Sequence, residues 1–290
     1  MIEVGELSVR TRSSGGKVAD KVNGDVPNGL RRLVLLIHGF ANSQNGASES
    51  FAEFIANLES IKETAKTQFP VPVFKFFWPG DNRVVGISQI TYSSEIPVAV
   101  DSAERLYEFF SGLAGPQGGP TEIYLVAHSL GSRVVLETLR YFARLRNDLL
   151  IFSSICLMAA AVPVSEVQDT HALLFASLLP ARRQVLFSTS DPILWLAFRP
   201  GEALAGEGMS EAVGRRGEPF EIWNARWNCK GFGHHDYWKS PLAALQLAKL
   251  VGLPVTQPIL DNAIVKREGP EKRQTLVAAP PETREVGVRR

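Results

Sequence analysis

The sequence predicts an α/β fold in which a mostly parallel sheet carries helices on both faces within a single domain. Short apolar runs rich in β-branched and aromatic residues alternate with longer segments of helical periodicity, which is typical of such a sheet. The chain has 290 residues, 45% of them hydrophobic and 21% charged. A chain of this size and composition can bury a large core without disulfides or metals.

Six segments are predicted to be strands because each is short, apolar and bounded by turn-forming residues. The uncharged run from Leu149 to Ser165 contains serines and Pro163, so we interpret it as a strand buried on both faces and expect no stable membrane insertion. The predicted strands are Leu33–Ile37, Val73–Trp78, Ile123–Ala127, Ser154–Ala160, Gln184–Thr189 and Phe220–Trp227.

Four segments between these strands are predicted to be helices. The first places Phe51, Phe54, Ile55 and Leu58 on one face at helical spacing. The last begins with Ser240 as N-cap followed by proline. The predicted helices are Ser48–Ile61, Ile96–Leu113, Ser132–Leu145 and Pro241–Val251.

Both ends of the chain are predicted to lie outside a single central domain of residues 30–261. Residues 1–29 have glycine and polar clusters with little apolar periodicity, which predicts an irregular arm or loose hairpin. Residues 262–290 are rich in Lys, Arg, Glu and Pro and have almost no aromatic residues. This composition predicts a mobile C-terminal tail.

Charge and cysteine content argue against several functions. The 31 basic and 30 acidic residues leave a net charge of +1, so we expect no nucleic-acid partner. The two cysteines, Cys156 and Cys229, form neither a zinc-site spacing nor a disulfide framework. The first ten residues include two acidic residues and no apolar h-region, which predicts a cytoplasmic protein without a secretory signal.

Ser129 is the candidate nucleophile. It follows the strand ending at Ala127 and precedes the helix beginning at Ser132, within the sequence Ala-His-Ser-Leu-Gly. A serine placed between a strand and a helix by small residues is typical of a nucleophile elbow, whose usual pattern is G-x-S-x-G. The sequence departs from that pattern at Ala127, the smallest available change. The alternative to a nucleophile is that Ser129 only caps the helix that follows it.

An acid and a base are expected further along the chain, since a serine hydroxyl needs both. Asp191 stands just after the strand Gln184–Thr189, where an acid in this architecture is expected, although it could also cap the following helix. His234 and His235 lie in a glycine-containing loop before the last helix. All three loops end at the carboxyl edge of a parallel sheet and can converge there.

Further residues are predicted to complete the site. The backbone N–H groups of Leu130 and Phe40 are the expected oxyanion donors, because one follows the nucleophile and the other lies in the His-Gly turn after the first predicted strand of the domain. Trp195 and Phe198 belong to an apolar helix after Asp191, and either line an acyl pocket or belong to the core.

The motifs L-L-I-H-G-F-A-N-S (35–43), F-F-W-P-G-D (76–81), A-H-S-L-G-S-R-V (127–134) and G-H-H-D-Y-W (233–238) resemble the α/β-hydrolase superfamily. The closest resemblance is to its bacterial serine-esterase-like branch, once catalogued as a domain of unknown function. The resemblance implies an α/β-hydrolase fold and carboxylester or thioester hydrolysis without metal or organic cofactor. It assigns Ser129 as nucleophile, Asp191 as acid and His234 as base.

The same resemblance favours His234 over His235 as base, because Gly precedes it and an aspartate and an aromatic residue follow two and three places later. His235 and Trp78 are then expected in the substrate pocket. We expect small or medium acyl esters as substrates. Alternatives that keep the same residues are an acyltransferase, an amidase and a non-catalytic binding protein of the same fold.

Overall fold

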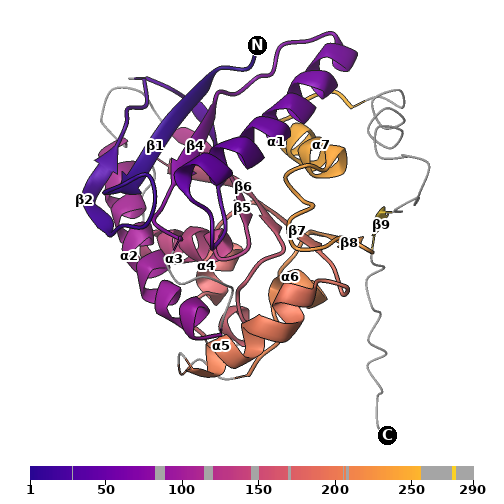
Figure 1. Ribbon diagram of the computed structural model, residues 1–290. Helices are drawn as coiled ribbons and strands as arrows, with labels where there is room; N and C mark the ends of the chain where they lie inside the picture. Colours follow the sequence, from indigo (N-terminus) through magenta and orange to yellow (C-terminus); the bar gives the residue numbers. More distant parts are fainter. Residues whose placement is uncertain are drawn as a thin grey trace, which may run out of the picture.

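The computed structural model describes residues 1–27, 29–81, 89–113, 120–144, 150–168, 171–204, 206, 209–255 and 276–278. Within these residues the strands form one nine-stranded sheet in the order β2-β1-β4-β3-β5-β6-β7-β8-β9 (Figure 1). Neighbouring strands from β1 to β8 in this order are parallel. The outer pairs β1–β2 and β8–β9 are antiparallel. The fold is therefore the predicted mostly parallel α/β sheet.

The six predicted strands correspond to β3 through β8, of which β6 begins four residues earlier than predicted and β8 is shorter, and β1, β2 and β9 were not predicted. Their bounds are β1 (Val4–Arg10), β2 (Val18–Asn23), β3 (Arg32–Ile37), β4 (Val73–Phe77), β5 (Thr121–His128), β6 (Leu150–Met158), β7 (Arg182–Phe187), β8 (Ala225–Cys229) and β9 (Leu276–Ala278).

Helices cover both faces of the sheet. The connection from β3 to β4 runs toward one edge and the connection from β4 to β5 runs back toward the other, so right-handed crossovers place α1 and α2 on opposite faces. Helix α1 packs against α7, and α2 packs against α3 (Figure 1). The helices are α1 (Gln44–Ala65), α2 (Gln89–Leu113), α3 (Gly131–Arg144), α4 (Leu174–Leu178), α5 (Arg199–Leu204), α6 (Val213–Arg216) and α7 (Pro241–Leu250), with a 3₁₀ turn η1 (Ser165–Val167) and a π-helical turn η2 (Leu194–Phe198).

The N-terminal segment differs from the prediction. Instead of an irregular arm, residues 4–10 form β1, which pairs with β4 in the sheet, and residues 18–23 form β2 beside it. The apolar side chains of Leu7 and Val9 are fully buried, and they alternate with Glu6 and Ser8 over too few residues to stand out in the sequence. The sheet therefore begins well before residue 30.

The predicted C-terminal tail, residues 262–290, lies outside the described residues except at 276–278, which form β9. The uncharged segment that includes residues 150–158 is strand β6, buried along most of its length. In the described part of the chain, no helix combines the length and apolarity needed to cross a membrane.

A buried cluster braces the loop after β3. The indole of Trp78 stacks on His38 with ring centroids 5.7 Å apart, and its Nε1–H donates to the His38 carbonyl at 2.8 Å. The backbone N–H of Trp78 donates to His38 Nε2 at 3.2 Å. From β1, Arg10 donates to the Trp78 carbonyl at 2.8 Å and pairs with Asp81. Strand β1 thus supports the loop that carries Gly39 and Phe40.

His38 is a neutral imidazole within this cluster. Its Nδ1 lies 2.9 Å from the Gly39 carbonyl, which can only accept, so Nδ1 carries the proton and Nε2 accepts from Trp78. Burial lowers the pKa of His38 from 6.5 to about 4. The folded protein therefore binds this proton less readily than the unfolded chain.

This pKa predicts that acid destabilises the protein through His38. Neutral His38 contributes about 3 kcal/mol to the free energy of unfolding. This contribution is fully present above pH 6.5 and is lost as the pH falls to about 4. Urea unfolding of the wild type and His38→Gln, whose side-chain oxygen can accept from Trp78 but cannot titrate, measures it between pH 7.5 and 4. The variant should lose less unfolding free energy on acidification. Equal losses in the two proteins would contradict the assignment.

Candidate active site

Ser129 lies in a sharp turn between β5 and α3. Its backbone has a φ of +52°, in the left-handed region that costs a non-glycine residue about 1–2 kcal/mol. Two hydrogen bonds hold this conformation: Ser129 N–H donates to the Met158 carbonyl at 2.9 Å, and Ala161 N–H donates to the Ser129 carbonyl at 3.1 Å. A strained serine at the end of a central strand is the geometry expected of a nucleophile elbow.

Two glycines let this turn approach the loop after β3. A Cβ atom on Gly39 would lie 2.8 Å from the Ser129 Cβ, and one on Gly131 would overlap the His38 carbonyl oxygen. A side chain at either position would push the two loops apart. Phe40 and Leu130, the predicted oxyanion residues, flank this contact: Phe40 follows Gly39, and Leu130 links Ser129 to Gly131.

The structure brings Ser129, His234 and Asp191 together in one hydrogen-bonded chain. Ser129 Oγ lies 2.8 Å from His234 Nε2, and His234 Nδ1 lies 2.8 Å from Asp191 Oδ2. All three residues are buried. Because the carboxylate accepts at Nδ1, the proton of neutral His234 lies there and Nε2 is left to accept from the serine hydroxyl.

Asp191 contacts His234 and also caps the helix that follows it, so it has both of the roles considered from the sequence. Its Oδ1 accepts from the backbone N–H groups of Ile193 and Leu194, each at 3.0 Å. The carboxylate therefore starts the helix that runs from residue 192 into η2 and α5, and the helix N–H groups fix its orientation toward His234.

The loop that carries His234 is held at several points. Ser188 Oγ donates to the Phe232 carbonyl at 2.9 Å, and Gly233 N–H donates to Asp236 Oδ2 at 2.7 Å. His128 Nε2 lies 2.7 Å from the carbonyl of His234 itself. Sequence reasoning did not assign roles to Ser188 or His128, since residues distant in the sequence supply their partners.

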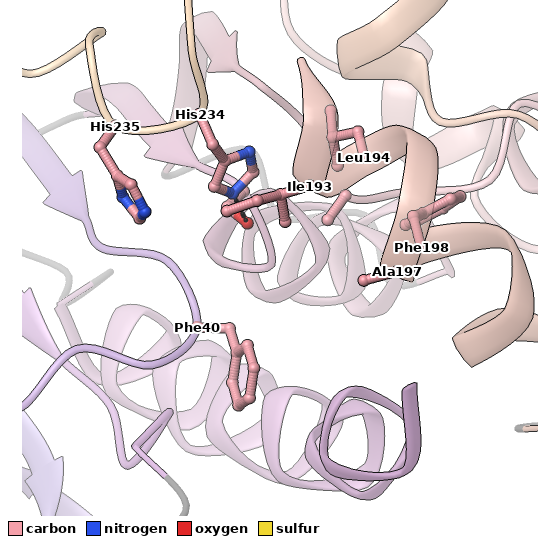
Figure 2. A pocket seen from close by; sticks show the side chains of 9 residues that line it. Phe40, Ile193, Leu194, Ala197, Phe198, His234 and His235 are labelled. Atoms are coloured by element: carbon pink, nitrogen blue, oxygen red, sulfur yellow. Dashed lines mark hydrogen bonds between the residues drawn. The ribbon is translucent and has the colours of Figure 1, made fainter. Parts of the chain in front are cut away.

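His235 occupies a different position from His234. Its ring stands nearly perpendicular to that of His234, with centroids 5.5 Å apart, and its side chain lies at the rim of a cavity beside Ser129 (Figure 2). Partial burial, followed by the nearby His234, lowers the pKa of His235. The contacts to Ser129 and Asp191 belong to His234.

The cavity is small and mainly apolar. Its volume is about 20 Å³, roughly the space of one water molecule. Helix residues after Asp191 form one wall, and Phe40 lies opposite them (Figure 2). The lining residues are Phe40, Ser129, Ala161, Ile193, Leu194, Ala197, Phe198, His234 and His235.

Two residues predicted to line the pocket lie elsewhere. Trp195 is 55% exposed and points away from the cavity, because its neighbour Leu194 occupies the inward face of the helix. The Arg215 guanidinium lies 5.9 Å from the centre of the Trp195 ring. Trp78 is fully buried against His38. Its role is to brace the loop of Phe40. Phe198 and His235 do line the cavity, as expected.

In the stretches of chain that the structure describes, no group of three or more His, Cys, Asp or Glu side chains could hold a metal ion. Both cysteines are buried and they form no disulfide with each other, and burial raises the pKa of the Cys156 thiol to about 12. Cys156 is therefore a protonated core residue at neutral pH.

Three solved structures match this chain at low sequence identity. The lin2722 gene product of Listeria innocua is 10% identical, with 78% of this chain and 96% of that chain covered at a TM-score of 0.43. The ydeN gene product of Bacillus subtilis is 16% identical, with 76% and 98% covered at a TM-score of 0.41. Carboxyl esterase 2 of Tuber melanosporum is 13% identical, with 78% and 80% covered at a TM-score of 0.40.

Among curated proteins, no sequence match was found. One protein family matches residues 17–195, which is more than half of the chain, and its description is "Alpha/beta hydrolase of unknown function (DUF900)". The matched residues include Ser129 and Asp191, and His234 lies beyond them. The chain, with its mostly parallel sheet and its elbow at Ser129, therefore belongs to the DUF900 family of α/β hydrolases.

Proposed function

We propose that this α/β hydrolase is a serine esterase that cleaves carboxylic esters through an acyl-enzyme intermediate. The observation that carries the proposal is the chain of two 2.8 Å hydrogen bonds from Ser129 through His234 to Asp191. A buried serine, imidazole and carboxylate in this order form the arrangement that activates a hydroxyl for acyl transfer.

In the first half of the proposed cycle, Ser129 Oγ attacks the ester carbonyl carbon while its proton passes to His234 Nε2. The carbonyl oxygen becomes an oxyanion, for which the N–H groups of Phe40 and Leu130 are the proposed donors. The bond to the leaving alcohol then breaks, and His234 returns the proton to the alcohol oxygen. Asp191 stabilises the imidazolium and keeps its ring oriented.

In the second half, water attacks the acyl-enzyme carbonyl and gives a proton to His234. The bond between the acyl carbon and Ser129 Oγ breaks, Ser129 recovers that proton, and the carboxylic acid leaves. Each half uses the same base and the same oxyanion donors. No metal ion takes part in the proposed steps.

The proposed substrates carry small or medium acyl groups. Apolar side chains around the cavity suit a hydrocarbon acyl chain better than a charged one. The small cavity, about 20 Å³, favours short acyl chains over long ones. Among the helix residues that line the cavity, Phe198 is the furthest along the chain from Asp191. It is therefore the proposed limit on acyl length.

Replacing Ser129 by alanine should lower kcat for p-nitrophenyl acetate and butyrate by about 10⁴- to 10⁶-fold, since the nucleophile is lost. Initial rates of p-nitrophenolate release measure this, and circular dichroism checks that the variant folds. Equal hydrolysis by wild type and Ser129→Ala would contradict the proposal. With methanol present, a methyl ester as the main product would indicate an acyltransferase instead.

Asp191→Asn separates the two contacts of this carboxylate. The amide oxygen can still accept from Ile193 and Leu194, so the melting temperature should change little. The amide N–H₂ faces His234 and favours the wrong tautomer, so kcat should fall by about 10⁴-fold. Asp191→Ala should lower kcat and also destabilise the fold by about 1 kcal/mol through loss of the cap. Full activity of Asp191→Asn would show that the carboxylate does not orient the base.

Phe198→Ala should extend the acyl chain that the site accepts. The ratio of kcat/KM for p-nitrophenyl octanoate to that for the acetate should rise about tenfold, equivalent to burying about two more methylene groups. Phe198→Leu should give an intermediate ratio. The matched control is Leu196→Ala, because Leu196 belongs to the same turn and is 60% exposed. An unchanged ratio in Phe198→Ala, or the same rise in Leu196→Ala, would rule out this role.

A further inference from the structure

His128 is a buried polar side chain that the proposed reaction does not use. It precedes Ser129 at the end of β5 and is 2% exposed. His128 is not one of the residues that line the cavity beside Ser129, so it does not face the substrate together with Ser129. Its ring lies against His234, with centroids 4.9 Å apart.

The hydrogen bond of His128 defines its tautomer. Nε2 lies 2.7 Å from the His234 carbonyl oxygen, which can only accept, so Nε2 carries a proton and donates. Nδ1 has no hydrogen-bond partner among the described residues. A Cβ on Gly39 would lie 2.8 Å from this Nδ1, so the Gly39 backbone covers that side of the ring. Burial, followed by the neighbouring His234, lowers the pKa of His128 well below its usual value.

The hydrogen bond from His128 to the His234 carbonyl is a second connection between the end of β5 and the base, in addition to the contact of Ser129 with the His234 ring. Ser129 Oγ meets the His234 ring, while His128 Nε2 holds the His234 backbone. Because His128 and Ser129 are consecutive residues of one buried strand end, the two contacts fix both ends of His234 against the same element. The contacts of Ser188 and Asp236 hold the loop at Phe232 and Gly233, two residues and one residue before His234.

The base needs such a tether because its loop contains Gly231 and Gly233, which restrict the backbone less than other residues. A displacement of about 1 Å between catalytic groups can reduce the rate by about 10²-fold. We propose that His128 is a positioning residue that donates Nε2–H to the His234 carbonyl and thereby holds the base at hydrogen-bonding distance from Ser129. This role rests on the proposed function of Ser129 and His234.

Three variants of His128 test the proposal. Glutamine can place an amide N–H₂ near the position of Nε2, whereas asparagine places its amide near Nδ1, where no acceptor lies. Methionine has a similar length and no donor. We expect kcat for p-nitrophenyl butyrate to fall about 10²-fold in His128→Met and His128→Asn, with KM within about twofold of wild type. His128→Gln should keep kcat within about threefold.

The difference between glutamine and asparagine is the decisive comparison, since both are polar amides. Melting temperatures are measured for all three variants, and the two amide variants carry the test if His128→Met does not fold. Wild-type kcat in His128→Asn, or equal losses in His128→Asn and His128→Gln, would overturn the role. In the second case the side chain would act through packing alone.

Proton NMR provides a readout that does not depend on turnover. In the wild type, the Nδ1 proton shared between His234 and Asp191 should give a resolved low-field signal, assigned by its loss in Asp191→Asn. The signal should persist in His128→Gln and broaden or disappear in His128→Asn. If the wild type cleaves no ester but these signals behave as expected, the esterase proposal fails and the positioning role stands. An unchanged signal in His128→Asn would overturn the positioning role.

Discussion

The close approach of two backbone turns, one after β3 and one after β5, is the constraint on which the rest of the site depends. Gly39 and Gly131 allow the contact because a side chain on either would meet the opposite loop. Ser129 adopts a left-handed conformation there, at a cost of about 1–2 kcal/mol. Hydrogen bonds from Ser129 to the last residue of β6, Met158, and from Ala161 just after that strand help to offset that cost. Because the two turns are fixed, Ser129 has a defined position, and the loops that carry Asp191 and His234 place their side chains in line with it.

Several polar residues near the site serve the fold and the proposed chemistry at once. Asp191 caps a helix with one oxygen and meets His234 with the other. His38 is held neutral by burial while it joins the loop after β3 to the loop after β4. His128 connects the strand of the nucleophile to the loop of the base. In each case a buried polar side chain makes a hydrogen bond that also orients a neighbouring element.

Much of this arrangement could be predicted from local sequence patterns. The strands β3 to β7 are short apolar runs, and Ser129, Asp191 and His234 each follow a predicted strand or lie in the loop before the last helix. What could not be predicted depends on partners distant in the sequence. Strand β1 is stabilised by β4, with only Leu7 and Val9 to mark it, and was expected to be irregular. Trp195 was expected in the pocket or in the core and is exposed instead, because the direction of a side chain on a short, partly π-helical turn is set by tertiary packing.

The proposal that Ser129 acts as a nucleophile is tested most directly by labelling with a fluorophosphonate, followed by mass spectrometry of the intact and digested protein. We expect one phosphonyl group per chain, located on the peptide that contains Ser129, and no labelling of protein unfolded in urea. A folded wild-type protein that stays unlabelled, or that carries the label on another residue, would contradict it.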